Sequence, residues 1–409
     1  MSVLMNNRFI GHISCIAFLL TLTPVAMAVS LAETIQAAVE RHPQYPLHQA
    51  LRKVESGYRQ QAESFFGGDP SVNLSVAGDS LGSDFGSGEY VAGVSLPVWL
   101  PGQREARRMI ADNLATQSVL ELARLGWEVA GDVLERAWQL RIAQAGVKQA
   151  LKQWAAARAL EKNVAHRFEA GELTRNDLLL AQQDMVETEA TYQEALSGLQ
   201  QAKLSWRNYT GLEGLPEDLE LFAQAEEVLT PLVQHPQLRA VLAQVQTAQA
   251  RVNDTRMQRR AAPVVSVYAK RDRGARNEDY TDSLGIELTV PLGIRSHIAP
   301  AIAEAEAELT AAETEAALLK RQLELGIANA EQELLKENRL LDLAQQKNRF
   351  SHARLQLSQR AFELGEMGLY QLLLARQQAA VAARDLEIRQ LEKQYAMTRK
   401  NHLLGVIPR

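Results

Sequence analysis

The sequence repeats itself at a spacing of 193 or 194 residues, and this repeat limits the possible folds more than any other feature. The matching positions are His42-Pro43 and His235-Pro236, Pro97 and Pro291, Phe168–Leu173 and Phe362–Met367, Leu178–Ala181 and Leu372–Ala375, and Gly211 and Gly405. They extend over most of the chain, so chance similarity is an implausible explanation. We therefore interpret residues 29–211 and 233–409 as two copies of one unit, joined by an equatorial segment at 212–232.

Long stretches without proline indicate what each copy contains. Proline is absent from residues 102–215 and from residues 301–407, and an interior proline costs a helix about 3 kcal/mol. Ala and Leu recur there at steps of three and four residues, as coiled-coil packing requires. We predict two long helical hairpins, at about 102–211 and about 298–405. Their first arms, of about 65 residues, would extend on the order of 100 Å, which excludes a compact globule.

Before each predicted hairpin the hydrophobic period changes from helical to alternating. Val72, Leu74 and Val76 alternate with polar residues, and a second such run ends at Val290. This pattern predicts one pair of strands at about 71–97 and another at about 263–291. Soluble hairpins show the same alternation, but strands of about nine residues with one apolar face can also span an outer membrane. Four strands cannot close a barrel, so membrane-spanning strands would require several chains to share one.

The first 28 residues have the features of a secretory signal peptide. Arg8 precedes an apolar stretch that is too short to span a membrane as a helix, and the segment ends in Ala26-Met27-Ala28. The only cysteine, Cys15, lies inside this segment. We expect no lipid on Cys15, because His12 stands where the lipid-attachment motif needs leucine. We therefore predict cleavage after Ala28 and an exported mature chain.

Composition and motifs give no support for catalysis or for nucleic-acid binding. The 44 basic and 49 acidic residues give a net charge of −5, which leaves no basic excess to hold a phosphate backbone. The histidines form no zinc-binding pair on a helix, and neither a nucleophile elbow nor a phosphate-binding loop is present. His42 and His235, each before a proline, are interpreted as helix-start residues. We predict no catalytic residue, metal site, cofactor or nucleic-acid partner.

A resemblance to a known family follows from these features. The signal peptide, the two copies of strand pair plus helical hairpin, and the paired turns Gly171-Glu172-Leu173 and Gly365-Glu366-Met367 resemble the TolC-type outer-membrane efflux channels. The stretch PVWLPGQREARR is similar to the cation-efflux (CzcC-like) branch. The resemblance implies a mainly α fold with a small β part. Each chain would supply two coiled-coil hairpins and four transmembrane strands to a trimeric α/β barrel tunnel.

The same resemblance implies a function and a set of partners. The protein would be a passive outer-membrane channel with a periplasmic helical extension, conducting substrates such as metal cations out of the periplasm. Its partners would be two further copies of itself, outer-membrane lipid, a periplasmic adaptor and an inner-membrane transporter of the RND type. Two alternatives remain open, namely a periplasmic adaptor and a type I secretion duct. Metal ions, drugs and secreted proteins all use ducts of this kind and are all candidate substrates.

Three groups of residues are candidate functional sites. The resemblance suggests that the adaptor docks at the turns, through Gly171, Glu172, Leu173, Gly365, Glu366 and Met367, although solvated hairpin ends are an equally simple interpretation of the acidic residues. Candidates for the periplasmic tunnel end are Asp177, Arg175, Gln371 and Arg376, with Arg175 and Arg376 as ion-pair partners for Asp177. Candidates for the membrane border are Trp99, Arg104, Arg107 and Arg108.

Overall fold

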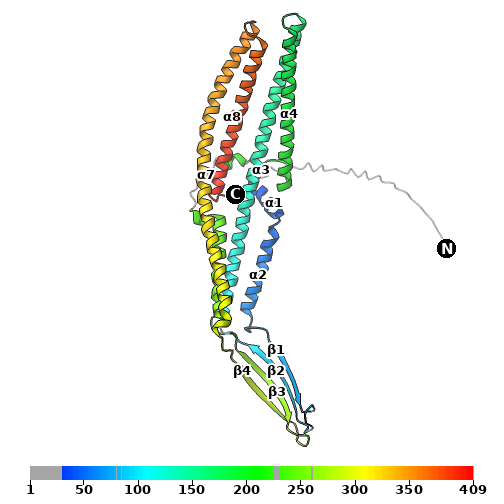
Figure 1. Cartoon of the computed structure of the whole chain (residues 1–409), viewed down its shortest axis with the longest axis vertical. Coiled ribbons are helices and arrows are strands. Elements are labelled where there is room, and N and C mark those ends of the chain that lie inside the picture. The colour runs from blue at the N-terminus through cyan, green and yellow to red at the C-terminus, as the bar shows by residue number, and fades with distance from the viewer. Residues whose placement is uncertain (1–29, 80, 84, 224–230, 259–260, 409) are drawn as a thin grey trace, which may run out of the picture.

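The computed structural model describes residues 30–408, except for residues 80, 84, 224–230, 259 and 260. The protein is elongated, with two helical hairpins at one end and a small antiparallel sheet at the other (Figure 1). The predicted signal peptide and Cys15 lie outside the described residues, as does part of the predicted equatorial segment. The prediction of a mainly helical chain with a small β part is confirmed.

The two predicted hairpins are continuous antiparallel helix pairs. The first consists of α3 (Gln103–Glu169) and α4 (Arg175–Thr210), and the second of α7 (Arg295–Glu363) and α8 (Leu369–Leu403). Helix α3 has 67 residues and α7 has 69, so each is about 100 Å long. Among the described residues, none of these helices is both long and apolar enough to cross a membrane.

Helix α7 begins at Arg295, before the position that its sequence indicated. The expected start of about 298 came from the proline-free stretch, yet Pro300 lies inside the helix. A proline near the start of a helix removes a single hydrogen bond and leaves the rest of the helix intact. The absence of proline therefore defined the interior of this helix and not its first residue.

Shorter helices accompany the hairpins in each repeat. The first repeat opens with α1 (Leu31–Arg41) and α2 (Tyr45–Glu63), and the second with the short 3₁₀ helix η1 (Leu232–Gln234) and α6 (Pro236–Met257). The short α5 (Leu219–Ala223) lies between the repeats. His235 is the N-cap of α6, where its side chain accepts a hydrogen bond from the N–H of Gln237. The interpretation of His235 as a helix-start residue is therefore confirmed. The same interpretation of His42 was wrong, because His42 is the C-cap of α1 and α2 begins only at Tyr45, after the N-cap Gln44.

The long helices lie side by side and form a wall. In the half that carries the turns, the order across the wall is α7, α8, α3, α4 (Figure 1). In the half that carries the sheet, α6 lies between α7 and α3, and α2 lies on the other side of α3. Helix α8 therefore joins the two hairpins, while α7 and α4 form the two lateral edges of the wall.

The main hydrophobic core lies at mid-length, where the hairpins meet α1 and α5. Trp138 and Trp206 are fully buried there. The indole N–H of Trp138 donates to Oγ1 of Thr398 at 3.1 Å, and that of Trp206 donates to the carbonyl of Gly214 at 3.2 Å. Both polar groups are thus satisfied inside the core. The first of these contacts connects α3 with α8, and so the first repeat with the second, while the other fastens α4 to the segment that follows it.

The four strands form one antiparallel sheet in the order β1-β2-β3-β4. Their bounds are Ser71–Gly78 for β1, Gly88–Pro97 for β2, Val264–Arg273 for β3 and Thr281–Thr289 for β4. The central pairing, β2 with β3, joins the first repeat to the second. The outer sides of β1 and β4 have no neighbouring strand within the described chain, so the sheet has two open edges.

Candidate functional site

The turn between α3 and α4 is closed by backbone and side-chain contacts. Gly171 has a φ of 78°, which a residue with a Cβ adopts only with strain. The N–H of Glu172 donates to the carbonyl of Arg167 at 2.9 Å, and the two side chains form an ion pair of 3.0 Å. Thr174 and Asp177 form a capping box, with side-chain-to-backbone hydrogen bonds of 3.2 and 3.0 Å, which fixes the start of α4.

The turn between α7 and α8 has the same backbone but fewer polar contacts. Gly365 has a φ of 77°, and the N–H of Glu366 donates to the carbonyl of Ala361 at 2.8 Å. Gly368 and Gln371 stand where the first turn has its capping pair, and Ala361 stands where the first turn has its arginine. Gly368 makes no side-chain cap, and Glu366 forms no ion pair among the described residues. The two predicted docking turns are therefore alike in shape and different in how they are held.

The two tips pack against each other through a small hydrophobic cluster. Its buried members are Val164, Ala181, Phe362, Leu369 and Leu372. The guanidinium of Arg167 lies 5.0 Å from the centre of the Phe362 ring, so a first-repeat cation covers a second-repeat aromatic residue. Glu172 and Glu366 are exposed at the same end, while Leu173 and Met367 are half-buried.

The candidate residues for the tunnel end do not pair as the sequence analysis expected. The carboxylate of Asp177 is engaged in the capping box, and Arg175 is exposed. Arg376 instead lies 3.9 Å from the carboxylate of Asp184, across the contact between α8 and α4. Both groups are largely buried, and burial raises the pKa of Asp184 while the arginine lowers it. The expected partner of Asp177 was wrong, because Oδ2 of this carboxylate accepts the capping hydrogen bonds from Thr174 and Arg376 lies against Asp184. Gln371 is exposed.

The predicted membrane-border residues lie where the helices meet the sheet. The indole N–H of Trp99 donates to the carbonyl of Ser64 at 3.1 Å. Nε of Arg104 donates to the carbonyl of Ala62 at 2.7 Å, so this guanidinium caps the last turn of α2. Trp99 therefore fastens the end of α2 to the segment that connects β2 with α3, and Arg104 fastens it to the first turn of α3.

The other two arginines of this junction form ion pairs between or within helices. Nε of Arg107 lies 3.2 Å from Asp254 on α6, and this carboxylate is buried. The same guanidinium lies 5.9 Å from the ring centre of Tyr58 on α2. Arg108 lies 3.5 Å from Glu105, one turn away on α3. Arg107 therefore links three helices, whereas Arg108 stays on the surface of one.

The sheet has one apolar and one polar face. Residues paired across strands point to the same side. The apolar face carries Val72, Leu74, Val76, Ala92, Val94, Val267, Ala269, Leu284 and Ile286. The polar face carries Ser71, Asn73, Ser95, Ser266 and Glu287, and Ser95 is hydrogen-bonded to both Asn73 and Ser266. Leu74, Ile286 and Leu284 are 78–86% exposed, so the apolar face is uncovered in the single chain.

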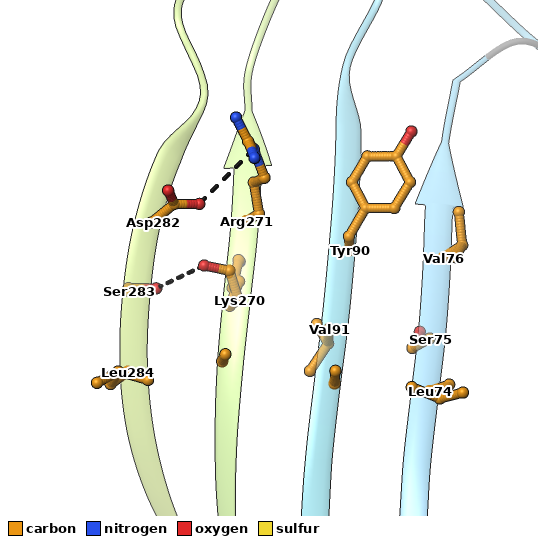
Figure 2. A pocket seen from close by; sticks show the side chains of 12 residues that line it. Leu74, Ser75, Val76, Tyr90, Val91, Lys270, Arg271, Asp282, Ser283 and Leu284 are labelled. Carbon is orange, nitrogen blue, oxygen red and sulfur yellow. Dashed lines mark hydrogen bonds and ion pairs between the residues drawn. The ribbon is translucent and has the colours of Figure 1, made fainter.

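Aromatic and charged residues mark both ends of the apolar face. Near the loops, the Tyr90 and Tyr280 rings lie 6.1 Å apart, and Arg271 lies 3.6 Å from Asp282. Figure 2 shows Tyr90, Arg271 and Asp282 beyond the leucines, at the rim of a shallow hollow of 780 Å³. At the helical end, Phe65 is 87% exposed, next to the junction that contains Trp99. The apolar band therefore has an amphipathic border on each side.

No protein-family model matches the chain, and no curated protein sequence is significantly similar to it. Solved structures do match. The outer membrane protein VceC from Vibrio cholerae has a TM-score of 0.70 and 15% identity, over 93% of this chain and 97% of that one. The Campylobacter jejuni CmeC outer membrane channel has a TM-score of 0.67 and 14% identity, and the match covers 92% of this chain and 85% of that one. The open Neisseria gonorrhoeae MtrE outer membrane channel has a TM-score of 0.68 and 17% identity, and the match covers 92% of this chain and 88% of that one.

The chain has the TolC-type outer-membrane channel fold. The match covers nearly the full length of this chain and of the channels, so it includes both hairpins and the sheet. The sequence-based resemblance to this fold is confirmed. Among the described residues of this TolC-type chain, no group of three or more His, Cys, Asp or Glu side chains is placed to hold a metal ion.

The TolC-type fold also brings together residues that the sequence analysis did not connect. The Trp127 ring is stacked on His402 at 4.3 Å and meets the edge of His235 at 4.9 Å. Burial lowers the pKa of His235 to about 4. Burial, together with His235, lowers the pKa of His402 to about 3, while Asp132 opposes this shift. The conspicuous His-Pro repeat identified His235, but no local pattern relates it to residues on α3 and α8.

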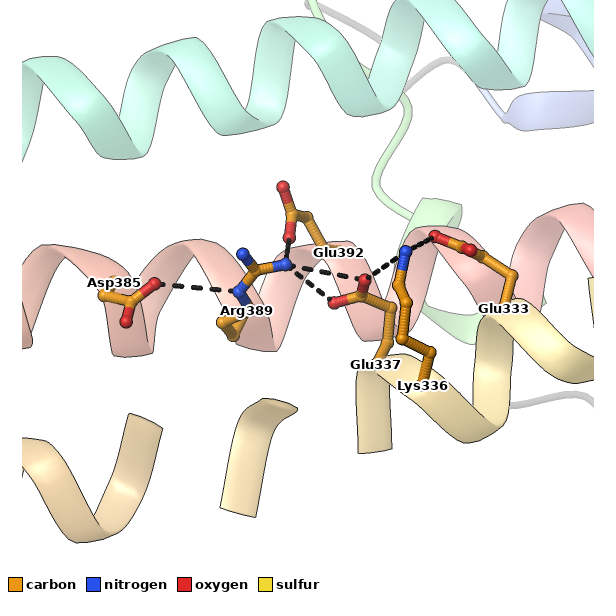
Figure 3. Close-up of polar contacts among 6 residues, drawn as sticks. All are labelled: Glu333, Lys336, Glu337, Asp385, Arg389 and Glu392. Carbon is orange, nitrogen blue, oxygen red and sulfur yellow. Dashed lines mark hydrogen bonds and ion pairs between the residues drawn. The ribbon is translucent and has the colours of Figure 1, made fainter. Parts of the chain in front are cut away.

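The second hairpin of the TolC-type fold contains a charged network that the first lacks. It comprises Glu333, Lys336, Glu337, Asp385, Arg389 and Glu392, drawn in Figure 3. Glu337 is 5% exposed and lies 3.1 Å from Arg389 and 3.3 Å from Lys336. One repeat earlier, the same positions carry Gln139, Ile142, Ala143, Thr191, Ala195 and Gly198. The network crosses from α7 to α8 and fixes their relative position.

Proposed function

We propose that this protein is the outer-membrane channel of a tripartite export pump. Three chains would place their sheets in the outer membrane and their helical hairpins in the periplasm. Substrates would pass through the enclosed space, driven by an inner-membrane transporter that is coupled through a periplasmic adaptor. The protein itself would act as a passive duct and not as an enzyme.

The observation that carries this proposal is the two-faced sheet with open edges. An apolar face exposed as fully as that around Leu284 and Ile286 needs a lipid or protein cover. In lipid, the unpaired backbone groups of β1 and β4 would have to be satisfied by further strands. Three copies joined edge to edge would supply twelve strands, within the range that closes in an outer membrane. Tyr90 and Trp99 would then stand at the two interfaces.

The proposal favours a channel over a periplasmic adaptor. An adaptor has no use for a sheet that exposes an apolar band between two amphipathic borders. The match to VceC, CmeC and MtrE over nearly the whole chain supports the same choice. A type I secretion duct would use the same architecture, so that alternative differs only in cargo and partner. Metal cations remain a proposed cargo, on the basis of the PVWLPGQREARR stretch.

The adaptor would dock at the two turns. The sheet lies at the opposite end of the helical body, so the turns would face the inner membrane (Figure 1). Glu172 and Glu366 are exposed there and offer negative charge beside the half-buried Leu173 and Met367. A partner segment with basic and apolar side chains would fit this end.

The first experiment tests the channel itself. Outer-membrane fractions should contain a trimer that survives mild detergent and dissociates on heating, and deletion of the gene should sensitise cells to members of a panel of metal salts, dyes and antibiotics. A stable monomer in the soluble fraction would contradict the proposal. The pattern of sensitivity would separate a metal channel from a drug channel or a protein duct.

The second experiment tests the docking turns. The Glu172→Lys/Glu366→Lys variant should form trimers in the outer membrane, because both side chains are exposed, but should not restore export. The yield of crosslinks between this variant and the adaptor should fall as well. The matched control is Glu313→Lys/Glu315→Lys, which changes two exposed carboxylates on α7 far from the turns. Export and crosslinking at the wild-type level in the turn variant would move the docking site elsewhere.

A further inference from the structure

The loop end of the sheet carries two arginines on the apolar face. In the register of the sheet, Tyr90 of β2 pairs with Arg271 of β3, and Arg271 pairs with Asp282 of β4. Arg271 is two residues from Ala269 on the apolar face and Arg273 is four, so both arginine side chains point to that face. The apolar face therefore ends, next to the loops, in a border that contains two guanidinium groups.

One aromatic ring holds both guanidinium groups at this border. The guanidinium of Arg271 lies 5.1 Å from the centre of the Tyr280 ring, and that of Arg273 lies 4.7 Å from it. Nε of Arg273 also donates to the carbonyl of Gly86 at 3.0 Å. Nε of Arg271 lies 3.6 Å from Asp282, whereas Arg273 has no ion pair among the described residues. Two cations thus share a single carboxylate.

The polar face has the opposite balance of charge at the same level. Lys270 lies 2.8 Å from Glu89 and 4.0 Å from Asp272, so one cation meets two carboxylates there. The carboxylate of Glu278 is used inside its own loop, where it accepts a hydrogen bond from the N–H of Gly274 at 3.0 Å. At this end of the sheet, the excess of cations therefore lies on the apolar side.

The hollow next to the arginines is lined by apolar side chains (Figure 2). Its floor contains Ala92 and Ala269, which are paired across β2 and β3. Leu74 and Leu284 stand at its two sides and are 78% and 86% exposed. Short side chains on the floor and longer ones at the sides leave room for hydrocarbon chains, directly beside the cations of the border.

The helical end of the apolar band is built differently. Arg104 of α3 caps the last turn of α2. Arg107 lies against the buried Asp254, and Arg108 is paired on its own helix. These arginines belong to α3 and already have partners. Within the four strands, guanidinium groups stand on the apolar face only at the loop end.

We propose that the border formed by Arg271 and Arg273 binds lipid A, the phosphorylated anchor of lipopolysaccharide. The phosphate groups of this glycolipid would accept hydrogen bonds from the two guanidinium groups, whose planar fork suits phosphate oxygens. Its acyl chains would lie in the hollow, against Leu74 and Leu284. The inference rests on the proposed function, because that function directs the loops to the outer leaflet of the outer membrane. It adds one specific lipid site to a face that otherwise offers only apolar contact.

Binding of lipid A by the purified trimer tests the two arginines. Wild-type trimer in a neutral detergent should bind added lipid A, counted as adducts by native mass spectrometry. Arg271→Gln/Arg273→Gln should bind it about tenfold more weakly, because each basic residue beside an anionic headgroup adds to the attraction. The matched control is Lys270→Gln/Arg251→Gln, which removes the same charge from the polar face and from α6, where Arg251 is 46% exposed. The control should bind lipid A as the wild type does.

The headgroup is tested by changing the lipid. Dephosphorylated lipid A should bind the wild-type trimer as weakly as intact lipid A binds Arg271→Gln/Arg273→Gln. Phosphatidylglycerol carries a phosphate on a smaller anchor and should be displaced when lipid A is added. Equal affinity for the two intact lipids would overturn the assignment to lipid A, because any anionic headgroup would then suffice.

Filling the hollow tests the acyl-chain part of the site. Ala92→Phe should weaken binding of lipid A several-fold, because the ring would occupy the floor of the hollow while both arginines remain. The matched control is Val267→Phe, which adds the same ring to the same face one residue pair nearer the helices. Binding by the control should stay within about twofold of the wild type, since two methylene-sized changes outside the hollow alter little of the contact.

The outcomes separate this inference from the proposed function. A wild-type trimer that binds lipid A no better than its dephosphorylated form overturns the inference and leaves the channel standing. An equal loss in Arg271→Gln/Arg273→Gln and in Lys270→Gln/Arg251→Gln overturns it as well, because overall charge would then explain the binding. A wild-type protein that never forms a trimer contradicts the proposed function first. A selective loss in the arginine variant, together with a loss in Ala92→Phe, supports the site.

Discussion

The two hairpin turns have one backbone and two different sets of side-chain contacts. Both have a glycine with φ near 78° and both close the preceding helix through a backbone bond from the glutamate that follows. Only the first turn adds a capping box and an ion pair, from Thr174, Asp177 and Arg167. Reversal of the chain therefore requires only a residue that can adopt positive φ. The capping box and the ion pair add stability to a turn that forms without them.

The largest expected effect comes from breaking the long helices at equivalent positions. Ala123→Pro in α3 and Ala317→Pro in α7 each remove a helical hydrogen bond and should cost about 3 kcal/mol or more of unfolding free energy. The first should be worse, because Leu125 and Trp127 nearby are buried, whereas Leu318 next to Ala317 is 51% exposed. Thermal unfolding and trimer yield measure both, with Ala→Ser at each position as control. Normal yield from either proline variant would contradict a continuous helix.

Acid should weaken the middle of the molecule before the tips. His235 and His402 have pKa values of about 4 and about 3 in the folded protein, below the ordinary value near 6.5, so the unfolded chain binds protons first. Stability is then complete above pH 6.5 and falls as pH drops toward 4, by about 2 kcal/mol for each histidine at pH 5.

Hydrogen exchange at pH 7 and pH 5, corrected for intrinsic rates, measures this loss. Protection should fall around the end of α8 and the start of α6 more than at the turns. His235→Asn keeps an N-cap residue and removes one titrating group, so its pH dependence should be smaller. Earlier loss at the turns would show that other groups control the acid response.

Removing the capping box from the first turn and installing one in the second tests whether a capping box stabilises either turn. Thr174→Ala should cost about 1 kcal/mol, seen as faster amide exchange at the start of α4. Gly368→Thr/Gln371→Asp should install the missing capping box in the second turn, because Gly368 has a φ of −74° and a ψ of 155°, suited to threonine. Slower exchange at the start of α8 is the expected result. Unchanged exchange there would show that the second turn has a different end geometry in solution.

The smallest expected difference concerns the two turn glutamates. Glu172→Gln removes the ion pair with Arg167 and should cost at most about 1 kcal/mol, because the pair is partly exposed. Glu366→Gln breaks no ion pair in the described structure and should leave the unfolding free energy unchanged. Denaturant titration of the two variants side by side measures this difference. A larger loss of unfolding free energy from Glu366→Gln than from Glu172→Gln would show that the second turn depends more on its glutamate.

The sequence was sufficient for features that depend on local pattern or on repetition. Long gaps between prolines predicted the two hairpins, and the paired Gly-Glu motifs predicted the turns at Gly171 and Gly365. Alternating residues predicted two strands in each repeat. These features were accessible because each is encoded within a few turns of helix or a few residues of strand, and because the second copy repeats the signal.

Contacts between distant segments were not accessible in the same way. Asp177 was expected to pair with an arginine, but Thr174 beside it formed a capping box, and Arg376 found Asp184 on another helix. The contact of Trp127 with two histidines depends on distant residues, since His402 is 275 positions away. Such contacts are set by how the helices are rotated against one another, which helical periodicity in one segment does not specify.

The charged network of the second hairpin has a consequence for motion. To slide α7 along α8 by one heptad, about 10 Å, the hairpin would have to pull Arg389 away from Glu337 and leave that buried carboxylate with only Lys336 of its own helix as a partner. The first hairpin has Ala143 and Ala195 at the corresponding positions. It is held instead by the hydrogen bond from the Tyr209 hydroxyl to Asp132 at 2.8 Å and by the stacking of Trp154 on Tyr192 at 5.4 Å. The two hairpins of each chain therefore resist axial displacement by different means, one through a desolvated ion pair that acid or salt can reach only by opening the helices, the other through aromatic packing.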